Sequence, residues 1–123
     1  MKLKFRAWLK KRQEMDNEID HISWLEDELY CIGDGITYMV SAEDLVLMQS
    51  TGLFDKNGKE IFEGDVVKMS KDVYSEPTYY EIVRHYGGAY RLDSKQHGCE
   101  LWLRHTDCEV VGNIYENKEL LDA

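Results

Sequence analysis

The stretch that decides the fold is LMQSTGLFDKNGKEIFEGDVV, from Leu47 to Val67. It contains two extended runs separated by Asn57-Gly58, and Gly64 interrupts the second run before a pair of valines. Asn-Gly between hydrophobic runs is the strongest short-range signal for a β-hairpin, because both residues tolerate the positive φ of a type I′ turn. We therefore predict a hairpin here, with positive φ at Gly58 and a sharp bend at Gly64.

The two valines after the bend predict a strand of a small barrel. Glycine lets the backbone bend, and β-branched side chains suit the pleated, half-buried surface of a strand. Neighbouring residues on a strand point to opposite faces. We therefore expect one of Val66 and Val67 to face the core and the other to face solvent.

Short strand patterns separated by turn signals cover much of the remaining chain. Residues 2–8 alternate between apolar and basic side chains, which predicts a half-buried first strand with its basic face outward. Residues 24–29 fit either a strand or a helical turn, whereas residues 101–103 alternate as a strand does. Gly87-Gly88 predicts a second hairpin. This pattern favours a barrel or sandwich over an α/β fold.

Three blocks of sequence carry a family resemblance. They are KFRAW at residues 4–8, the central block at residues 47–67, and EVVGNIYENKELL at residues 109–121. In this order and at these places they resemble the YopX family of small proteins encoded by phages and prophages of Gram-positive bacteria. The resemblance implies a β-rich fold with an SH3-type barrel, a phage origin and self-assembly. It brings no activity and no catalytic residue with it.

The fold expected from these patterns is mainly β, with only short helical turns. Residues 1–50 form an N-terminal β-rich region, and residues 51–123 form a small SH3-type barrel. The chain has one proline and no Gly/Ser-rich linker, so we expect the two regions to form one compact unit. At 123 residues, with 43% hydrophobic residues, the chain is long and apolar enough for one ordinary core.

Composition also bears on location. No apolar run approaches the length of a transmembrane helix, and no apolar segment follows the basic start. Three cysteines at irregular spacing form a poor disulfide framework and fit a reducing compartment. We therefore predict a protein of the host cytoplasm without a membrane partner.

The net charge of −9 argues against general affinity for DNA or RNA, which depends on lysine and arginine contacts to phosphates. The charge is uneven, because a basic first dozen residues precede an acidic stretch. A solvated surface explains the stretch simply. Alternatively, its carboxylates imitate DNA and inhibit a host nucleic-acid-binding protein. The acidic residues are Glu14, Asp16, Glu18, Asp20, Glu26, Asp27 and Glu28.

The only metal-like cluster in the sequence is His97, Cys99, His105 and Cys108. Zinc requires four such ligands in a tetrahedral arrangement, but this spacing matches no familiar zinc module. A nucleophilic Cys108 would need His105 and Asp107 oriented toward it, and sequence neighbours on a strand do not converge. No phosphate loop, dinucleotide fingerprint or nucleophile elbow is present. We predict no catalytic residue, no metal and no cofactor.

Aromatic residues are the remaining feature, since they exceed what one small barrel core encloses. Most should pack as cross-strand pairs, and the surplus should lie in an interface, where tyrosine and tryptophan contribute most of the binding energy. We therefore expect a non-enzymatic, self-associating module that binds a host or phage protein. The aromatic residues in question are Trp8, Trp24, Trp102, Tyr79, Tyr80, Tyr86, Tyr90 and Tyr115.

Overall fold

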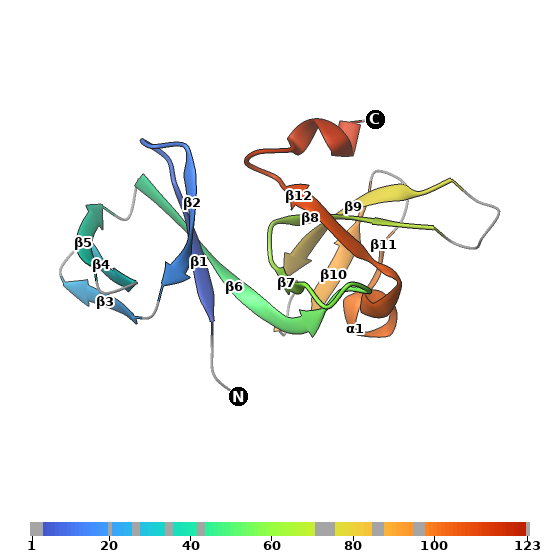
Figure 1. Cartoon of the computed structure of the whole chain (residues 1–123), viewed down its shortest axis with the longest axis horizontal. Coiled ribbons are helices and arrows are strands. Elements are labelled where there is room, and N and C mark those ends of the chain that lie inside the picture. The colour runs from blue at the N-terminus through green and yellow to red at the C-terminus, as the bar shows by residue number, and fades with distance from the viewer. Residues whose placement is uncertain are drawn as a thin grey trace. The chain divides into compact units, whose positions relative to one another are not determined.

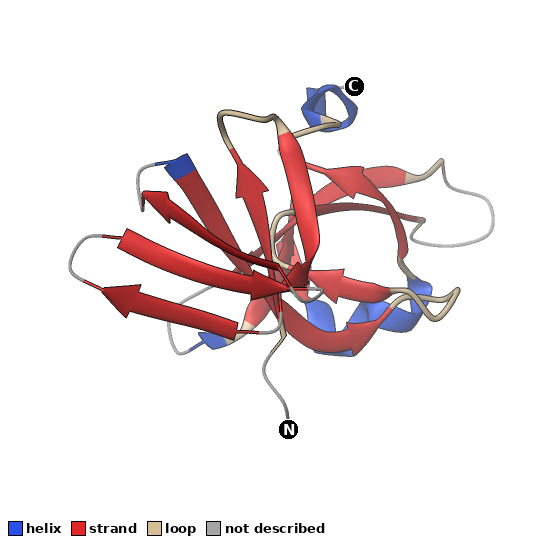
Figure 2. Cartoon of the chain, turned by 60° about the vertical axis from the view of Figure 1, so that its left-hand side comes forward, coloured by secondary structure: helices blue, strands red, loops and turns tan. Residues whose placement is uncertain are grey.

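A computed structural model describes residues 4–19, 21–25, 28–33, 36–41, 44–70, 76–84, 88–94 and 98–122. The chain divides into two compact units, Met1–Ser50 and Thr51–Ala123. Strands dominate both units, and the helices are short (Figures 1 and 2). The prediction of a mainly β protein is confirmed, whereas the SH3-type assignment stays a prediction. Among the described residues, no helix is long and apolar enough to cross a lipid bilayer.

In the first unit, strand β1 (Phe5–Leu9) lies between β2 (Glu14–Ile19) and the first half of β6 (Leu45–Phe54). Both pairings are antiparallel. A second antiparallel sheet has the strand order β3-β4-β5 and follows β2 in the chain. Its strands are β3 (His21–Leu25), β4 (Glu28–Gly33) and β5 (Ile36–Ser41). Residues 24–29 thus belong to two paired strands and not to a helical turn, apart from residues 26 and 27, which lie outside the described residues.

The first strand differs from the expectation in its burial. The core of this unit contains Ala7 and Leu9, yet Arg6 on the opposite face is only 7% exposed. The prediction of a basic, solvent-facing side is therefore wrong at Arg6. The physical reason is that β1 is a central strand with a neighbour on each side. Alternation in the sequence shows which residues share a face of the strand, but it does not show which face is exposed to solvent.

The second unit contains a curled antiparallel sheet in the order β11-β10-β9-β8-β12 (Figure 1). Strand β6 ends here, with β7 (Glu60–Phe62) beside it. The single α-helical turn α1 (Leu101–Arg104) and the 3-10 helices η3 (His105–Asp107) and η4 (Lys118–Asp122) complete the described part. The sheet strands are β8 (Asp65–Met69), β9 (Thr78–Arg84), β10 (Tyr90–Asp93), β11 (Gly98–Glu100) and β12 (Glu109–Asn113).

The core of this unit lies on one face of the curled sheet. Strands β8, β9 and β10 contribute side chains to it, and α1 adds the fully buried Leu101. Strands β9 and β10 pair as the predicted second hairpin, although its turn at residues 85–87 lies outside the described residues. The buried cluster consists of Ile61, Val67, Met69, Tyr80, Ile82, Leu92, Leu101 and Cys108.

The hairpin predicted at Asn57-Gly58 is present, but its turn is of another type. Gly58 has φ of +82°, whereas Asn57 is not among the described residues with positive φ. The Gly58 amide donates to the Asp55 carbonyl, and the Asp55 amide donates to the Lys59 carbonyl. This arrangement is a three-residue loop that ends in a left-handed glycine. The type I′ prediction is therefore wrong, and the prediction for Gly58 is confirmed.

Gly64 has φ of +85° and occupies the turn between β7 and β8, as predicted. Its amide donates to the Ile82 carbonyl at 2.8 Å, and its carbonyl accepts from the Ile114 amide at 2.9 Å. The buried Asp65 closes the same turn by accepting a hydrogen bond from the Phe62 amide. The turn thus connects β7 to the curled sheet and is held by segments distant in sequence.

Replacing Gly58 with valine should lower the free energy of unfolding by about 1–2 kcal/mol, because a β-branched residue is disfavoured at positive φ. A side-chain Cβ at Gly58 would meet no atom within 4 Å, so the cost comes from the backbone alone. Urea denaturation measures it. Asn57→Ala is the matched control and should change stability by less than about 0.5 kcal/mol, whereas a type I′ turn would make both positions sensitive.

Candidate functional site

The described cysteine and histidine residues singled out in the sequence come from β11 and from the segment around η3. His97 lies outside the described residues, Cys99 is on β11, and Cys108 follows η3. The described part of the chain contains no group of three or more histidine, cysteine or acidic side chains arranged to hold a metal ion. The two cysteines pack with the same buried cluster and are free thiols.

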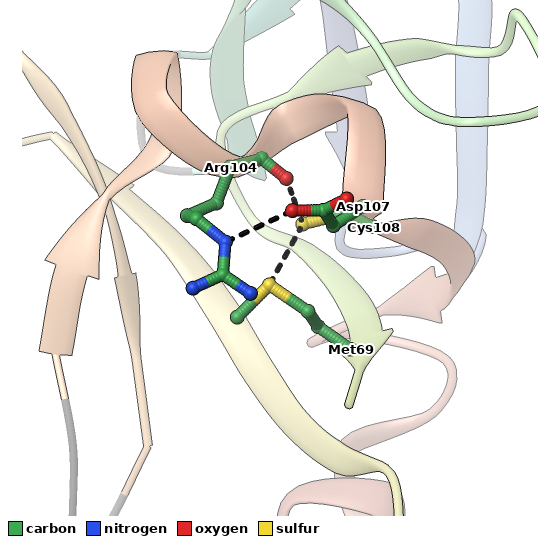
Figure 3. Close-up of polar contacts among 4 residues, drawn as sticks. All are labelled: Met69, Arg104, Asp107 and Cys108. Carbon is green, nitrogen blue, oxygen red and sulfur yellow. Dashed lines mark hydrogen bonds and ion pairs between the residues drawn. The ribbon is translucent and has the colours of Figure 1, made fainter. Parts of the chain in front are cut away.

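Cys108 is fully buried and has local partners (Figure 3). Its thiol donates to the Arg104 carbonyl at 3.3 Å, and its sulfur lies 3.9 Å from the Met69 sulfur. Burial, together with nearby Cys99 and Asp107, raises the pKa of the Cys108 thiol to about 12. Burial also raises the pKa of Cys99. Both thiols are therefore protonated near neutral pH, whereas metal binding and nucleophilic attack require the thiolate.

His105 and Asp107 contact other groups. The His105 Nδ1 atom lies 2.8 Å from the Phe54 carbonyl oxygen, a contact that joins η3 to the end of β6. The Asp107 carboxylate accepts from the Arg104 guanidinium at 3.0 Å (Figure 3). These contacts hold the segment of residues 101–108 in place, which is a structural role.

The acidic stretch is described only in part. Glu14 and Asp16 lie on β2, the edge strand of its sheet, and Glu14 is exposed. The tight connection that precedes them exposes Lys10, Lys11 and Arg12, so positive charge adjoins the acidic strand. The side chains of the other five acidic residues are outside what the structure describes, and the inhibitor hypothesis stays a prediction.

The aromatic residues divide clearly by burial. Trp8 and Tyr80 are buried, whereas Tyr79, Tyr90 and Tyr115 are half-buried. Trp102 is 64% exposed and is the one member of the predicted set, within the described residues, whose side chain lies mainly in solvent. Trp24 and Tyr86 fall outside the residues whose side chains are described.

The strand predicted at residues 101–103 is a helical turn, and this correction creates the candidate site. In α1, Leu101 points into the core, while Trp102 and Leu103 point outward with exposures of 64% and 59%. Three alternating residues are too few to separate a strand from one helical turn. A strand would have placed Leu101 and Leu103 on the same face, whereas the helix separates them.

Phe54 is the third exposed large hydrophobic residue, and its backbone lies beside the segment that follows Trp102 and Leu103. Phe54 ends β6 and is 50% exposed. Two hydrogen bonds hold the end of β6 against η3, one between His105 and the Phe54 carbonyl and one from the Lys56 amide to the Cys108 carbonyl. These three side chains are the exposed large hydrophobic residues of the described part. We call them the apolar patch.

Sequence reasoning missed two members of the apolar patch. The sequence pattern puts Leu103 on a strand and Phe54 in the hairpin. The only sequence signal was Trp102, because tryptophan is costly to expose and enriched at interfaces. The position of a residue in the sequence does not show whether other segments cover its side chain, so the apolar patch could be found only in the folded molecule.

The comparisons with known proteins agree with this fold. A family model described as YopX protein matches residues 4–122. The crystal structure of protein EF1440 from Enterococcus faecalis is similar over 98% of this chain and 99% of that chain, with 30% identity and a TM-score of 0.62. The crystal structure of protein yopX from Bacillus subtilis is similar over 95% and 96%, with 20% identity and a TM-score of 0.67. No curated protein matches the sequence.

Proposed function

The chain belongs to the YopX protein family, and from this premise we propose that it is a non-enzymatic accessory module that self-associates through its apolar patch. The self-associated module then binds a host or phage protein. The observation that carries the proposal is the exposure of Phe54, Trp102 and Leu103, at 50%, 64% and 59%. Large apolar side chains gathered on a surface mark interaction sites in folded proteins.

The composition of the apolar patch supports a protein interface over a small-molecule site. Tryptophan is among the residues that contribute most binding energy at protein interfaces, and its rigid ring loses little entropy on binding. Trp102 and Leu103 are adjacent on a helical turn that the buried Leu101 anchors in the core. A rigid, outward-facing pair of this kind presents its apolar area without first rearranging the fold.

Two further observations support the setting we propose, a phage or prophage protein in the cytoplasm of its host. The family resemblance implies the phage origin. Cys99 and Cys108 are free thiols, as expected in a reducing compartment. The protonated state of both thiols, which follows from their raised pKa, also supports a protein without thiol chemistry.

Replacing Trp102 and Leu103 with alanine should convert the assembled protein to monomer at micromolar concentration. Each truncation at a central interface position weakens association by about tenfold or more, because buried apolar contacts are lost. Sedimentation velocity and light scattering measure the change. Both side chains are mainly exposed in the isolated chain, so the fold should remain intact.

Thr106→Ala is the matched control, since Thr106 is an exposed residue of the neighbouring turn η3 and is not part of the apolar patch. This variant should assemble as the unaltered chain does. Circular dichroism and thermal unfolding confirm that all variants are folded. A monomeric unaltered chain that also recovers no partner from host lysate would show that the proposed function is wrong.

A further inference from the structure

The turn beside the apolar patch presents positive charge in a protein of net charge −9. Lys56 and Lys59 follow Phe54 in this turn, and both are exposed. The Lys56 amide donates to the Cys108 carbonyl at 2.9 Å, so the turn lies against the end of η3. Within the described residues, the Lys56 ammonium makes no ion pair. The apolar patch therefore has a cationic border.

The other charged groups near this border are already engaged. Asp55 attracts Lys59, but Asp55 is buried and its carboxylate accepts hydrogen bonds from three backbone amides. The Arg104 guanidinium is paired with Asp107 at 3.0 Å and adds no net charge. The charge that a partner would meet beside the apolar patch is thus that of the two lysines.

The opposite face of the curled sheet in the same unit carries two carboxylates side by side. Tyr80 and Ile82 of β9 belong to the core cluster beside α1, so Glu81 between them faces the other way. The strand register places Glu81 directly opposite Asp93 of β10, where like charges repel each other. Burial and nearby Asp93 raise the pKa of Glu81, in agreement with this repulsion. A cation supplied by a partner would relieve it.

The C-terminal turn η4 lies on this second face and adds to its acidic character. It contacts β8 and β9, and its Lys118 attracts Glu81. The turn and the residues before it also contribute two exposed carboxylates and two half-buried leucines, so apolar area accompanies the charge. What we call the η4 surface consists of Glu81, Asp93, Glu116, Glu119, Leu120 and Leu121.

The described cations of this face do not neutralise its carboxylates. Two ion pairs cancel, Lys68 with Glu109 at 3.2 Å and Arg91 with Glu100 at 4.0 Å. Arg91 also lies near Asp93, but one guanidinium carries one charge for both carboxylates. Lys118 is then the one remaining cation, among the described residues, for the four carboxylates of the η4 surface. This surface therefore has a net negative charge.

The charges discriminate between two ways in which copies of the chain can meet. Contact of the apolar patch with the same patch of a second copy would bring four lysines together, and like charges across an interface are unfavourable. Contact with the η4 surface joins opposite charges and covers the two leucines. The apolar patch and the η4 surface lie on opposite sides of the curled sheet, because Leu101 anchors α1 in the core and η4 lies on the other face (Figure 1). A contact between them therefore requires two copies.

We propose that the apolar patch of one copy, with Lys56 and Lys59, binds the η4 surface of a second copy. The inference rests on the self-association proposed above and names the surface that meets the apolar patch. Such a contact uses different surfaces on the two copies. Each added copy leaves one surface of each kind available, so the assembly is a closed ring or an open chain rather than a symmetric dimer.

Two charge-reversal variants of the full chain test the contact from both sides. One combines Lys56→Glu with Lys59→Glu, and the other, the η4 variant, combines Glu116→Lys with Glu119→Lys. Each variant alone should associate about tenfold more weakly, because it places like charges across the contact. An equimolar mixture should recover the assembly, because every contact between unlike copies then joins opposite charges. Sedimentation velocity measures all three samples.

Circular dichroism checks that both variants are folded. Should either double variant be unstable, the single variants Lys56→Glu and Glu119→Lys repeat the test with smaller changes in charge. Each should associate about threefold more weakly, and their mixture should again recover the assembly.

A control separates local from overall charge. Glu14→Lys combined with Glu76→Lys changes the net charge as the η4 variant does, at exposed residues that belong to neither surface, and should associate as the unaltered chain does. If the η4 variant also associates normally, or the mixture does not recover, the inference is overturned, while loss of assembly on Trp102→Ala still supports self-association. A monomeric unaltered chain overturns both.

Discussion

Replacing Asp55 with asparagine should lower the free energy of unfolding by about 2–4 kcal/mol, the largest effect expected of a single polar substitution here. One oxygen of the buried carboxylate accepts from the Asn57 and Lys59 amides, at 2.9 and 2.8 Å, and the other accepts from the Val110 amide at 2.8 Å. Asparagine keeps only one acceptor, so at least one amide loses its partner. Urea denaturation at neutral pH measures the difference.

The effect of Asp55→Asn should depend on pH in a defined direction. Burial alone would raise the pKa of Asp55, but the hydrogen bonds from the Val110, Lys59 and Asn57 amides outweigh it and lower the pKa below 3.8. A carboxyl with a lowered pKa in the folded state stabilises the protein above its unfolded pKa, and this stabilisation is lost as the pH falls through the folded value. The difference between the two proteins should therefore narrow below about pH 4.

Glu76→Gln is the control for this experiment, because Glu76 is exposed and its substitution should change stability by less than about 0.5 kcal/mol. A destabilisation by Asp55→Asn of similar size to that of the control would contradict the structural role. If the difference in the free energy of unfolding between the two proteins stays constant down to pH 3, the charge of Asp55 does not contribute to stability.

Val66→Ala and Val67→Ala should each lower the free energy of unfolding by about 1.5–3 kcal/mol, from lost apolar burial and the cavity left behind. Both side chains are fully buried, so the expectation that one faces solvent is wrong. Val67 belongs to the core cluster between the sheet and α1, and Val66 does not. We attribute the burial of Val66 to η4, which contacts β8 and β9.

Lys68→Ala on the same strand is the control for the valine variants. The Lys68 side chain is 39% exposed and pairs with Glu109 at 3.2 Å, a surface ion pair worth about 1 kcal/mol at most. Chemical denaturation of the three variants shows whether both valines of β8 are buried or only one of them. If only Val67→Ala is destabilising, then η4 does not cover the second face in solution.

The local elements that the sequence predicted well have causes within a few residues. Gly58 and Gly64 both adopt positive φ, because tight turns at these points require a conformation that glycine tolerates best. The strands on either side of these turns contain β-branched and aromatic residues, which favour strands, and β9 pairs with β10 as predicted. The turn type at Asn57 was wrong because the Asp55 side chain, and not the turn residues alone, organises the loop.

The elements that the sequence missed depend on distant residues. Leu101 of the helical turn is buried in the core. The Lys56 amide donates to the Cys108 carbonyl and so holds the end of the segment that contains this turn. Arg6 is buried because β1 has strands on both sides. Neither fact has a counterpart in the local pattern, since burial depends on what packs against a residue and not on its neighbours in the chain.

The sequence by itself determined the β-rich class, the two glycine turns and the family, because these depend on backbone preferences and on ordered blocks of residues. Only the tertiary structure decided that both valines of β8 are buried and that Phe54, Trp102 and Leu103 remain uncovered. Turn preference acts over a few residues, so it can be recognised along the chain. Exposure is the outcome of packing between segments as far apart as β6 and α1, and it exists only once they have come together.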